Sequence, residues 1–134
     1  MRVSLDTNVL VSAFTTRGIC ADVLAVTLAE HQLVLGEKVL GELSRVLEQK
    51  MGMPSEAVLE TQAFLRQEAA VISQQADVEV SIRDPDDVEV LAQAVSGLAD
   101  VLVTGDRDLL DVAGQLPIEV LTPRGFWEKL HGGS

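Results

Sequence analysis

Short apolar runs alternate with segments of helical periodicity along this 134-residue chain. In the segment 37–50, for example, Val39, Leu43 and Val46 recur at the spacing of three and four residues that marks one face of a helix. Strands that alternate with helices favour a parallel sheet covered by helices on both faces. The sequence therefore predicts an α/β fold with three layers, α/β/α, around a central and mostly parallel sheet.

The element boundaries follow from the same pattern. Extended segments are predicted at 2–5, 32–35, 71–72, 78–80, 101–103 and 118–121, and helices at 8–14, 20–30, 37–50, 55–69, 85–96, 107–113 and 123–130. Ser55 is the predicted capping residue of the helix 55–69, and Gly97 is predicted to end the helix that Asp84-Pro85 begins. We expect one domain over residues 1–134, with a frayed tail at 130–134.

The composition indicates a globular core built from aliphatic residues. Hydrophobic residues make up 47% of the chain and aromatic residues only 3%. The single cysteine, Cys20, excludes an intrachain disulfide, and we interpret it as a small buried hydrophobic residue. No apolar stretch reaches the roughly 18 residues that a membrane span needs, and Met1-Arg2 leads directly into a predicted strand. We therefore expect a cytoplasmic protein with no membrane segment.

The net charge of −11 argues against contacts with nucleic acid unless cations intervene. Phosphate contacts depend on clusters of Lys and Arg, and the sequence has none. This inference weakens if several acids bind divalent cations, because such cations invert the local field. Charge alone therefore leaves the substrate class open.

Acidic residues follow two of the predicted strands, at the point where each strand ends. Asp6 comes directly after the strand 2–5, and Asp106 follows the strand 101–103. In open α/β sheets, ligands bind beyond the carboxyl ends of the strands, so we expect these carboxylates to meet at one edge. Crowded carboxylates repel one another unless a cation neutralises them, which predicts a Mg²⁺ or Mn²⁺ site.

Each acid also has a structural explanation when it is taken alone. Asp84 and Asp106 stand at helix starts, where aspartate caps free backbone amides. Glu42 alone is more often a solvated helix residue, and Asp86, Glu89 and Asp111 are interpreted as surface charge. The joint arrangement of the acids therefore carries the metal hypothesis.

The chain resembles the PIN-domain ribonucleases, the fold of the VapC-type toxins of toxin–antitoxin systems. The similarity spans residues 1 to about 121. The residues that carry it are Leu5-Asp6-Thr7-Asn8-Val9-Leu10, Glu42, Arg83-Asp84-Pro85-Asp86-Asp87 ahead of Leu91-Ala92, and Leu102-Val103-Thr104-Gly105-Asp106-Arg107-Asp108-Leu109-Leu110.

The resemblance implies an acidic site, which is at once the catalytic and the metal site. Its predicted members are Asp6, Glu42, Asp87 and Asp106, with Asp84 and Asp108 in reserve. Thr7, Asn8 and Thr104 would orient the carboxylates through their short hydrogen-bonding side chains. The third acid departs from the family pattern, because the position three residues before Leu91-Ala92 is Val88.

The implied activity is metal-dependent hydrolysis of RNA phosphodiester bonds by an endoribonuclease that uses one or two Mg²⁺ or Mn²⁺ ions. A toxin role implies a small antitoxin that inserts an Arg or Lys into the metal site. The resemblance also implies a homodimer, for which the candidate contacts are Leu24, Leu28, Val58 and Phe64. Arg17 is the predicted contact to a substrate phosphate.

Other functions fit part of the pattern. With Val88 at the departing position, the chain could be a weak nuclease or a binding module that keeps only the fold. A haloacid-dehalogenase-like phosphatase would need a second aspartate where Asn8 stands, and a receiver domain would need a lysine after the strand 118–121. His31 and His131 lie outside every motif, which argues against histidine catalysis.

Overall fold

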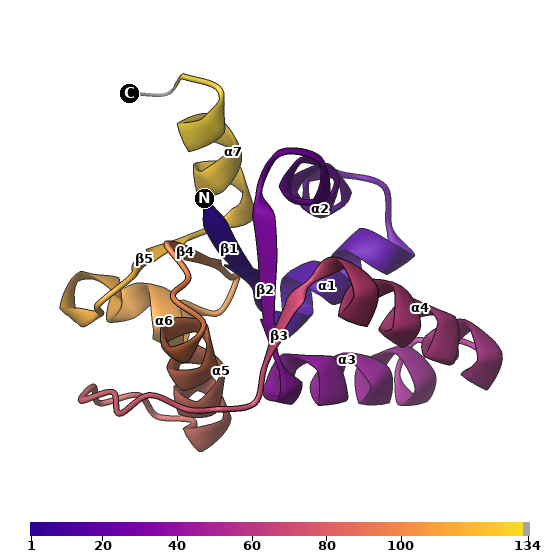
Figure 1. Cartoon of the computed structure of the whole chain (residues 1–134), viewed down its shortest axis with the longest axis horizontal. Coiled ribbons are helices and arrows are strands. Elements are labelled where there is room, and N and C mark those ends of the chain that lie inside the picture. Colours follow the sequence, from indigo (N-terminus) through magenta and orange to yellow (C-terminus); the bar gives the residue numbers. More distant parts are fainter. Residues whose placement is uncertain (133–134) are drawn as a thin grey trace.

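The computed structural model describes residues 1–132 and contains a parallel sheet of five strands (Figure 1). The strand order is β3-β2-β1-β4-β5, and each neighbouring pair is parallel. The strands are β1 (Arg2–Leu5), β2 (Gln32–Gly36), β3 (Ala70–Ile72), β4 (Val101–Val103) and β5 (Glu119–Leu121).

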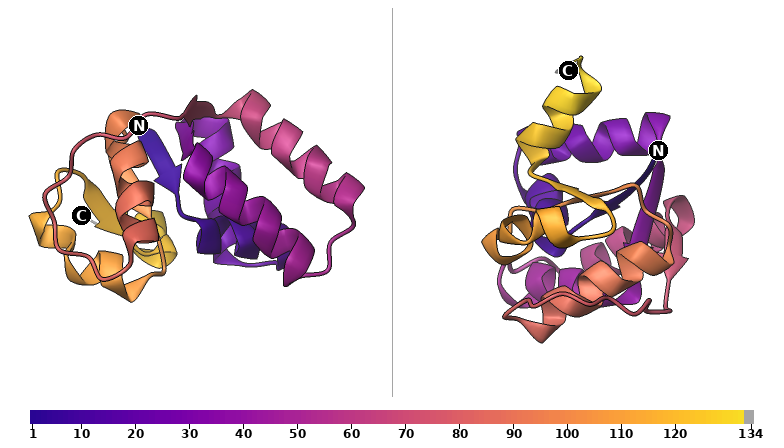
Figure 2. Two further views of the ribbon diagram at one scale, coloured as in Figure 1. Left: turned by 90° about the horizontal axis from the view of Figure 1, so that it is seen from below. Right: turned by 90° about the vertical axis from the view of Figure 1, so that its left-hand side faces the viewer.

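Helices cover both faces of this sheet, so the predicted three-layer α/β/α fold is confirmed. In Figures 1 and 2, α2 and α7 lie on one side of the sheet and α5 on the other, with α3 and α4 packed beside each other. The helices are α1 (Thr7–Thr15), α2 (Ile19–Glu30), α3 (Glu37–Gln49), α4 (Ser55–Glu68), α5 (Pro85–Ser96), α6 (Arg107–Asp111) and α7 (Pro123–Leu130), and a 3₁₀ turn spans Ala113–Gln115.

The chain changes direction across the sheet at β1. It first runs outward from β1 through β2 to β3, then crosses by way of α5 to β4 and continues to β5. The register pairs Val3 with Leu33 on one side and with Val101 on the other, so β1 and β4 are neighbours. Their carboxyl ends therefore meet at the switch point, where α/β sheets bind ligands.

Leucine and valine fill the layers between the sheet and its helices. All of the fully buried large side chains are Leu except Phe126, as the scarcity of aromatic residues predicts. Strand residues of β1, β2 and β4 are buried on both faces, which explains their continuous apolar runs. The largest fully buried side chains are Phe126, Leu5, Leu10, Leu33, Leu35, Leu40, Leu43, Leu47, Leu65, Leu91, Leu102 and Leu109.

The segment 73–84 forms no strand, which contradicts the extended segment predicted at 78–80. Val78, Val80 and Ile82 are half-buried against the core, whereas the residues between them are exposed. This alternation resembles that of a strand, but here it reflects only the packing of side chains against the core, because the segment is not part of the sheet order. Its backbone is tied instead to α5, where Ala76 N–H donates to Ala92 O at 3.1 Å.

Two helix boundaries also differ from the prediction. Ser55 is the first residue of α4, which follows Pro54 and has no side-chain cap, so Ser55 does not cap that helix. The predicted helix 107–113 ends at Asp111 and is followed by the short 3₁₀ turn. At the other end of the chain, α7 continues to Leu130, and residues 133–134 of the predicted frayed tail lie outside the described residues.

The predicted dimer contacts fall partly inside the core. Leu24 and Val58 are buried within the chain, which accounts for them without a second subunit. Leu28 is half-buried, and Phe64 on α4 is 42% exposed. Cys20 is also half-buried rather than fully enclosed.

Among residues 1–132, no single helix has the length and apolar character of a membrane span. The pair α1 and α2 together meets that test of length and composition, with a bend of 103° between them.

Leu98 adopts a backbone conformation that suits glycine better. It follows α5 with φ of 59°, and its side chain is 75% exposed. Leu98→Gly should stabilise the protein by about 1 kcal/mol, because a Cβ in the left-handed region carries a cost of that order. Urea unfolding at equilibrium measures the change. Leu98→Ala, which keeps the Cβ, should show no such gain, and an equal gain in both variants would contradict the explanation.

Candidate functional site

Asp6 lies at the carboxyl end of β1 and starts α1. Its side chain is 4% exposed and accepts hydrogen bonds from Thr7 N–H at 2.8 Å, Asn8 Nδ2 at 3.3 Å and Thr104 Oγ1 at 2.7 Å. Burial raises the pKa of Asp6, the bonds from Thr104 and Thr7 oppose this, and the charges of Asp106 and Glu42 add to it. Because a carboxylate offers about four lone-pair positions, these three bonds leave about one for a cation.

Thr104 connects the ends of β1 and β4. Its side chain is fully buried, and its hydroxyl donates to Asp6 Oδ2 while accepting from Asp106 N–H at 2.9 Å. Asn8 makes a second link, because its Oδ1 accepts from Gly105 N–H at 3.1 Å. Asp106 in turn caps α6 by accepting from Asp108 N–H at 2.8 Å. The two strand-end aspartates are thus held by one hydrogen-bonded network.

Glu42 reaches the same place from α3. Its Oε2 accepts a hydrogen bond from Thr7 Oγ1 at 3.0 Å, and its Oε1 lies 3.7 Å from Lys38 Nζ. Lys38 also pairs with Asp86 at 2.8 Å and with Glu89 at 3.4 Å, both on α5. The hydrogen bond to Asp86, together with that to Glu89, raises the pKa of Lys38. Lys38 therefore joins α3 to α5 beside the acids.

The start of α3 is fixed by a side chain from α5. Lys38 N–H donates to Gln93 Oε1 at 2.9 Å, which satisfies a free amide of the first turn. Gly36 precedes this turn, and a Cβ there would lie 2.7 Å from Gln93 Cβ and overlap its amide. Glycine at position 36 thus permits the contact that sets the position of α3, and with it that of Glu42.

Three aspartates of α5 have different surroundings. Asp84 caps the helix by accepting from Asp86 N–H at 2.9 Å, and the side chain of Asp86 is 62% exposed. Asp87 is 8% exposed. Burial, followed by the charge of Asp106, raises the pKa of Asp87 to about 7. The protein itself therefore does little to stabilise the ionised form of the Asp87 carboxyl.

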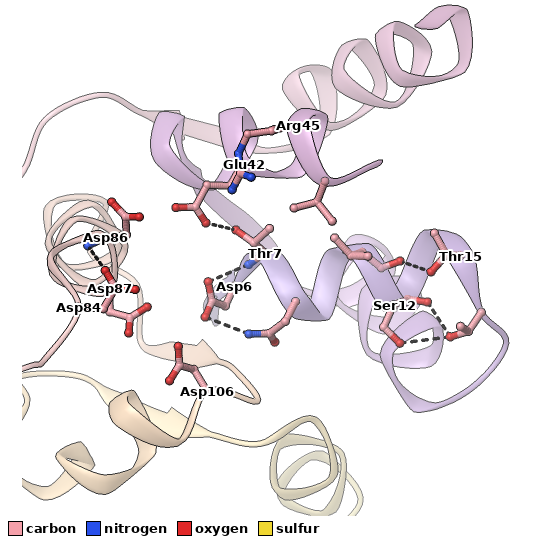
Figure 3. A pocket seen from close by; sticks show the side chains of 14 residues that line it. Asp6, Thr7, Ser12, Thr15, Glu42, Arg45, Asp84, Asp86, Asp87 and Asp106 are labelled. Carbon is pink, nitrogen blue, oxygen red and sulfur yellow. Dashed lines mark hydrogen bonds between the residues drawn. The ribbon is translucent and has the colours of Figure 1, made fainter. Parts of the chain in front are cut away.

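These acids line a cavity of about 560 Å³ (Figure 3). We call Asp6, Glu42, Asp84, Asp86, Asp87 and Asp106 the acidic cluster. The cavity continues past this cluster between α1 and α3. The remaining lining residues are Thr7, Asn8, Val11, Ser12, Thr15, Thr16, Arg45 and Val46.

The donor set fits a hard divalent cation. One carboxylate oxygen from each of Asp87, Asp106 and Asp108 lies within 4.8 Å of the others. Oxygen ligands of this kind are those that Mg²⁺ and Mn²⁺ prefer. The raised pKa values of Asp6 and Asp87 indicate the same need for positive charge.

The predicted site residues divide into acids and the residues that donate hydrogen bonds to them. Asp6, Glu42, Asp87 and Asp106 line the cavity together with the reserve residue Asp84, and Asp108 joins the group of three carboxylates. Thr7, Asn8 and Thr104 make the orienting hydrogen bonds that the prediction gave them. Val88 is half-buried and does not line the cavity.

The cavity lining adds to two expectations. Arg17 is exposed outside the lining, so its contact to a substrate phosphate stays a prediction, whereas Arg45 lines the cavity, since it follows Glu42 by three residues and shares its helix face. Asp86 is exposed, in agreement with its interpretation as surface charge, and it also lines the cavity and pairs with Lys38. The hydroxyl groups of Ser12 and Thr15 on α1 and of Thr16 directly after it line the cavity and were not predicted, although the spacing of Ser12 and Thr15 places them on one face of that helix.

A family model described as PIN domain matches residues 2–108, which is most of the chain. The chain belongs to the PIN domain family. Membership of this family leaves no support for a receiver domain. It also leaves none for a haloacid-dehalogenase-like phosphatase, which would need an aspartate where Asn8 stands. No curated protein is similar enough to match the chain.

Solved structures share the fold of this PIN domain. VapBC2 from Rickettsia felis, bound to a DNA fragment from its promoter, aligns with a TM-score of 0.64 at 17% identity, over 90% of this chain and 97% of that chain. VapBC-1 from nontypeable Haemophilus influenzae aligns with a TM-score of 0.63 at 19% identity, over 92% and 99% of the two chains.

In the metal-free PIN domain, the contribution of Asp87 to stability should fall as the pH rises from about 4 to about 7. Asp87 has a pKa of about 7 in the folded chain and the ordinary value of 3.8 when unfolded, so the folded state binds more protons in this window. Asp87→Asn should therefore match the original protein near pH 4 and be more stable above pH 7, by about 2 kcal/mol.

Urea unfolding in EDTA between pH 4 and pH 8 tests this expectation. Asp111→Asn removes the same charge from an exposed position outside the cavity and should change stability by less than about 0.5 kcal/mol at every pH. Equal stability of Asp87→Asn and the original protein at pH 8 would show that Asp87 is not strained by its neighbours.

Proposed function

We propose that this PIN domain is a divalent-metal-dependent endoribonuclease and the toxin of a toxin–antitoxin pair. The observation that carries the proposal is the acidic cluster around one cavity at the switch point of the sheet. Membership of the PIN domain family supports the same reaction class. The described residues that line this cavity include no His and no Cys.

Asp87 and Asp106 would be the central ligands of one or two Mg²⁺ or Mn²⁺ ions, because both belong to the acidic cluster and to the group with Asp108. Asp6 and Glu42 would complete the site from β1 and α3. A bound cation supplies Lewis acidity toward a phosphodiester and makes water more acidic. It would also lower the raised pKa of Asp87 and so keep that carboxyl ionised at neutral pH.

The side chains around these acids would hold them in place before the substrate arrives. Thr104 and Asn8 fix the orientation of Asp6, and Thr7 fixes Glu42. Fixed carboxylates present their free lone pairs in one geometry, so little reorganisation accompanies the reaction. The site would thus act mainly by positioning and by compensation of charge.

The proposed partner is a small antitoxin that places an Arg or Lys in the acidic cavity. The fold is shared with VapBC structures, and the cavity carries the negative charge that a basic side chain complements. A homodimer is part of the same proposal, with the half-buried Leu28 and the exposed Phe64 as its remaining candidate contacts.

Mn²⁺ titration by calorimetry, paired with cleavage of end-labelled single-stranded RNA, tests the function. The original protein should bind Mn²⁺ and cleave RNA, and EDTA should stop cleavage. Asp106→Asn should lose roughly 100-fold or more in cleavage rate, because a ligand that neutralises charge at the reacting phosphate contributes several kcal/mol. Its binding of Mn²⁺ should weaken in parallel.

Asp111→Asn is the matched control, since Asp111 lies on the same helix as Asp108 but is exposed and outside the cavity. It should bind Mn²⁺ and cleave RNA as the original protein does. A protein that takes up no Mn²⁺ and leaves varied RNAs intact would reject the nuclease and favour a binding module that keeps only the fold.

A further inference from the structure

The cavity is far larger than the acidic cluster needs. A bound water occupies about 30 Å³, and an ion with its waters a small multiple of that, whereas the cavity holds about 560 Å³. This volume lies within the range of about 300–1,000 Å³ that is typical of ligand sites. The part between α1 and α3 therefore has room for an organic group beside the ions.

The two walls of this part differ in chemistry. On α3, Arg45 is the only basic residue among those that line the cavity in the described part of the chain. It is exposed, and none of the ion pairs found within residues 1–132 involves it. Its guanidinium therefore offers up to five N–H donors in a planar fork, which suits phosphate oxygens.

Ser12 and Thr15 on α1, together with Thr16 directly after this helix, form what we call the hydroxyl wall. Ser12 and Thr15 are labelled in Figure 3. Thr15 Oγ1 donates to Val11 O at 2.7 Å and Thr16 Oγ1 donates to Ser12 O at 2.8 Å. Ser12 Oγ lies 3.1 Å from Thr16 Oγ1, and either hydroxyl can be the donor of that pair. Thr15 and Thr16 thus donate back to the backbone of α1, and their oxygens can accept a further hydrogen bond.

An acceptor wall is unsuited to phosphate, which also offers only acceptors, but it suits a ligand hydroxyl. The ribose 2′-OH is such a donor, and it distinguishes RNA from DNA. Val11 and Val46 add apolar lining that can contact the carbon atoms of a sugar. The cavity thus offers, side by side, one site for a phosphate and one for a ribose.

We propose that the part of the cavity between Arg45 and the hydroxyl wall binds the RNA nucleotide next to the cleaved bond, with its phosphate at Arg45 and its ribose at α1. The proposal rests on the ribonuclease function proposed above and names the part of RNA that this site recognises. The net charge of −11 argued against contacts with nucleic acid. In this proposal the guanidinium of Arg45 supplies a local positive charge, so the chain needs no extended basic surface.

Equilibrium binding tests the subsite without cleavage. Labelled single-stranded RNA is titrated with the Asp106→Asn chain at several salt concentrations, with enough Mn²⁺ to saturate its weakened metal site, and fluorescence anisotropy is read. Adding Arg45→Gln should weaken binding about tenfold at low salt. It should also reduce the slope of log affinity against log salt by about 0.7, the amount expected for one lost phosphate contact on a single strand.

Lys50→Gln is the matched control. It removes the same charge near the end of α3, from an exposed residue outside the cavity lining, and should leave the slope unchanged. Arg45→Lys keeps the charge and should retain the slope. A slope that Arg45→Gln leaves unchanged overturns the subsite, and Arg45 would then be available to an acidic partner protein instead.

The ribose contact is read with Thr15→Val, which keeps the shape of the side chain but removes the acceptor oxygen. The affinity for RNA should fall about fivefold and that for DNA of the same sequence should not change. An equal loss for RNA and DNA overturns the ribose assignment.

The subsite and the proposed function can fail separately. If the original protein cleaves RNA with Mn²⁺ and Arg45→Gln changes neither affinity nor slope, the subsite is wrong and the nuclease stands. If no cleavage or Mn²⁺ binding occurs but RNA binding depends on Arg45 as described, the nuclease is wrong and the subsite stands.

Discussion

The pairing of β1 with β4 is the constraint on which the rest of the site depends. These strands are far apart in sequence, and their register brings Leu5 opposite Val103, so that Asp6 and Thr104 follow side by side. The ladder continues one step further, since Asp6 N–H donates to Val103 O at 2.9 Å. The hydroxyl of Thr104 then ties both strand-end aspartates into one network. A shift of one residue in this register would turn every side chain of β4 to the other face and separate the acids.

The acidic cluster opposes folding as much as it serves binding. Burial raises the pKa of both Asp6 and Asp87, neighbouring carboxylates raise both pKa values further, and this cost must be offset elsewhere. The sheet and its leucine core supply the compensating free energy, because strands β1, β2 and β4 are buried on both faces. Lys38 compensates only the outer side, where Glu42, Asp86 and Glu89 meet it. The inner carboxylates are left for a ligand.

The sequence was sufficient to predict the features that depend on local pattern. Continuous apolar runs identified the buried strands, and the strand-end positions of Asp6 and Asp106 placed them at one edge of the sheet. Features that depend on tertiary packing were not predictable in this way. The alternation at Val78 and Val80 was mistaken for a strand, because half-burial leaves the same pattern whether or not the backbone is paired. Arg17 was preferred to Arg45 as the phosphate contact, since only the packing of α1 against α3 decides which arginine lines the cavity.

The contact between Gly36 and Gln93 couples two positions that are distant in sequence, so a substitution at one constrains the residue at the other. A side chain at position 36 would require a smaller residue at 93, yet a smaller residue could no longer accept the bond from Lys38 N–H. A substitution at either position alone is therefore disfavoured. A simultaneous substitution at both positions would also need a new acceptor for the Lys38 N–H at the start of α3. The angle at which α3 presents Glu42 is thus set from α5, the helix that also carries Asp87. A glycine and a glutamine thus fix the packing of α3 against α5, the two helices that carry Glu42 and Asp87.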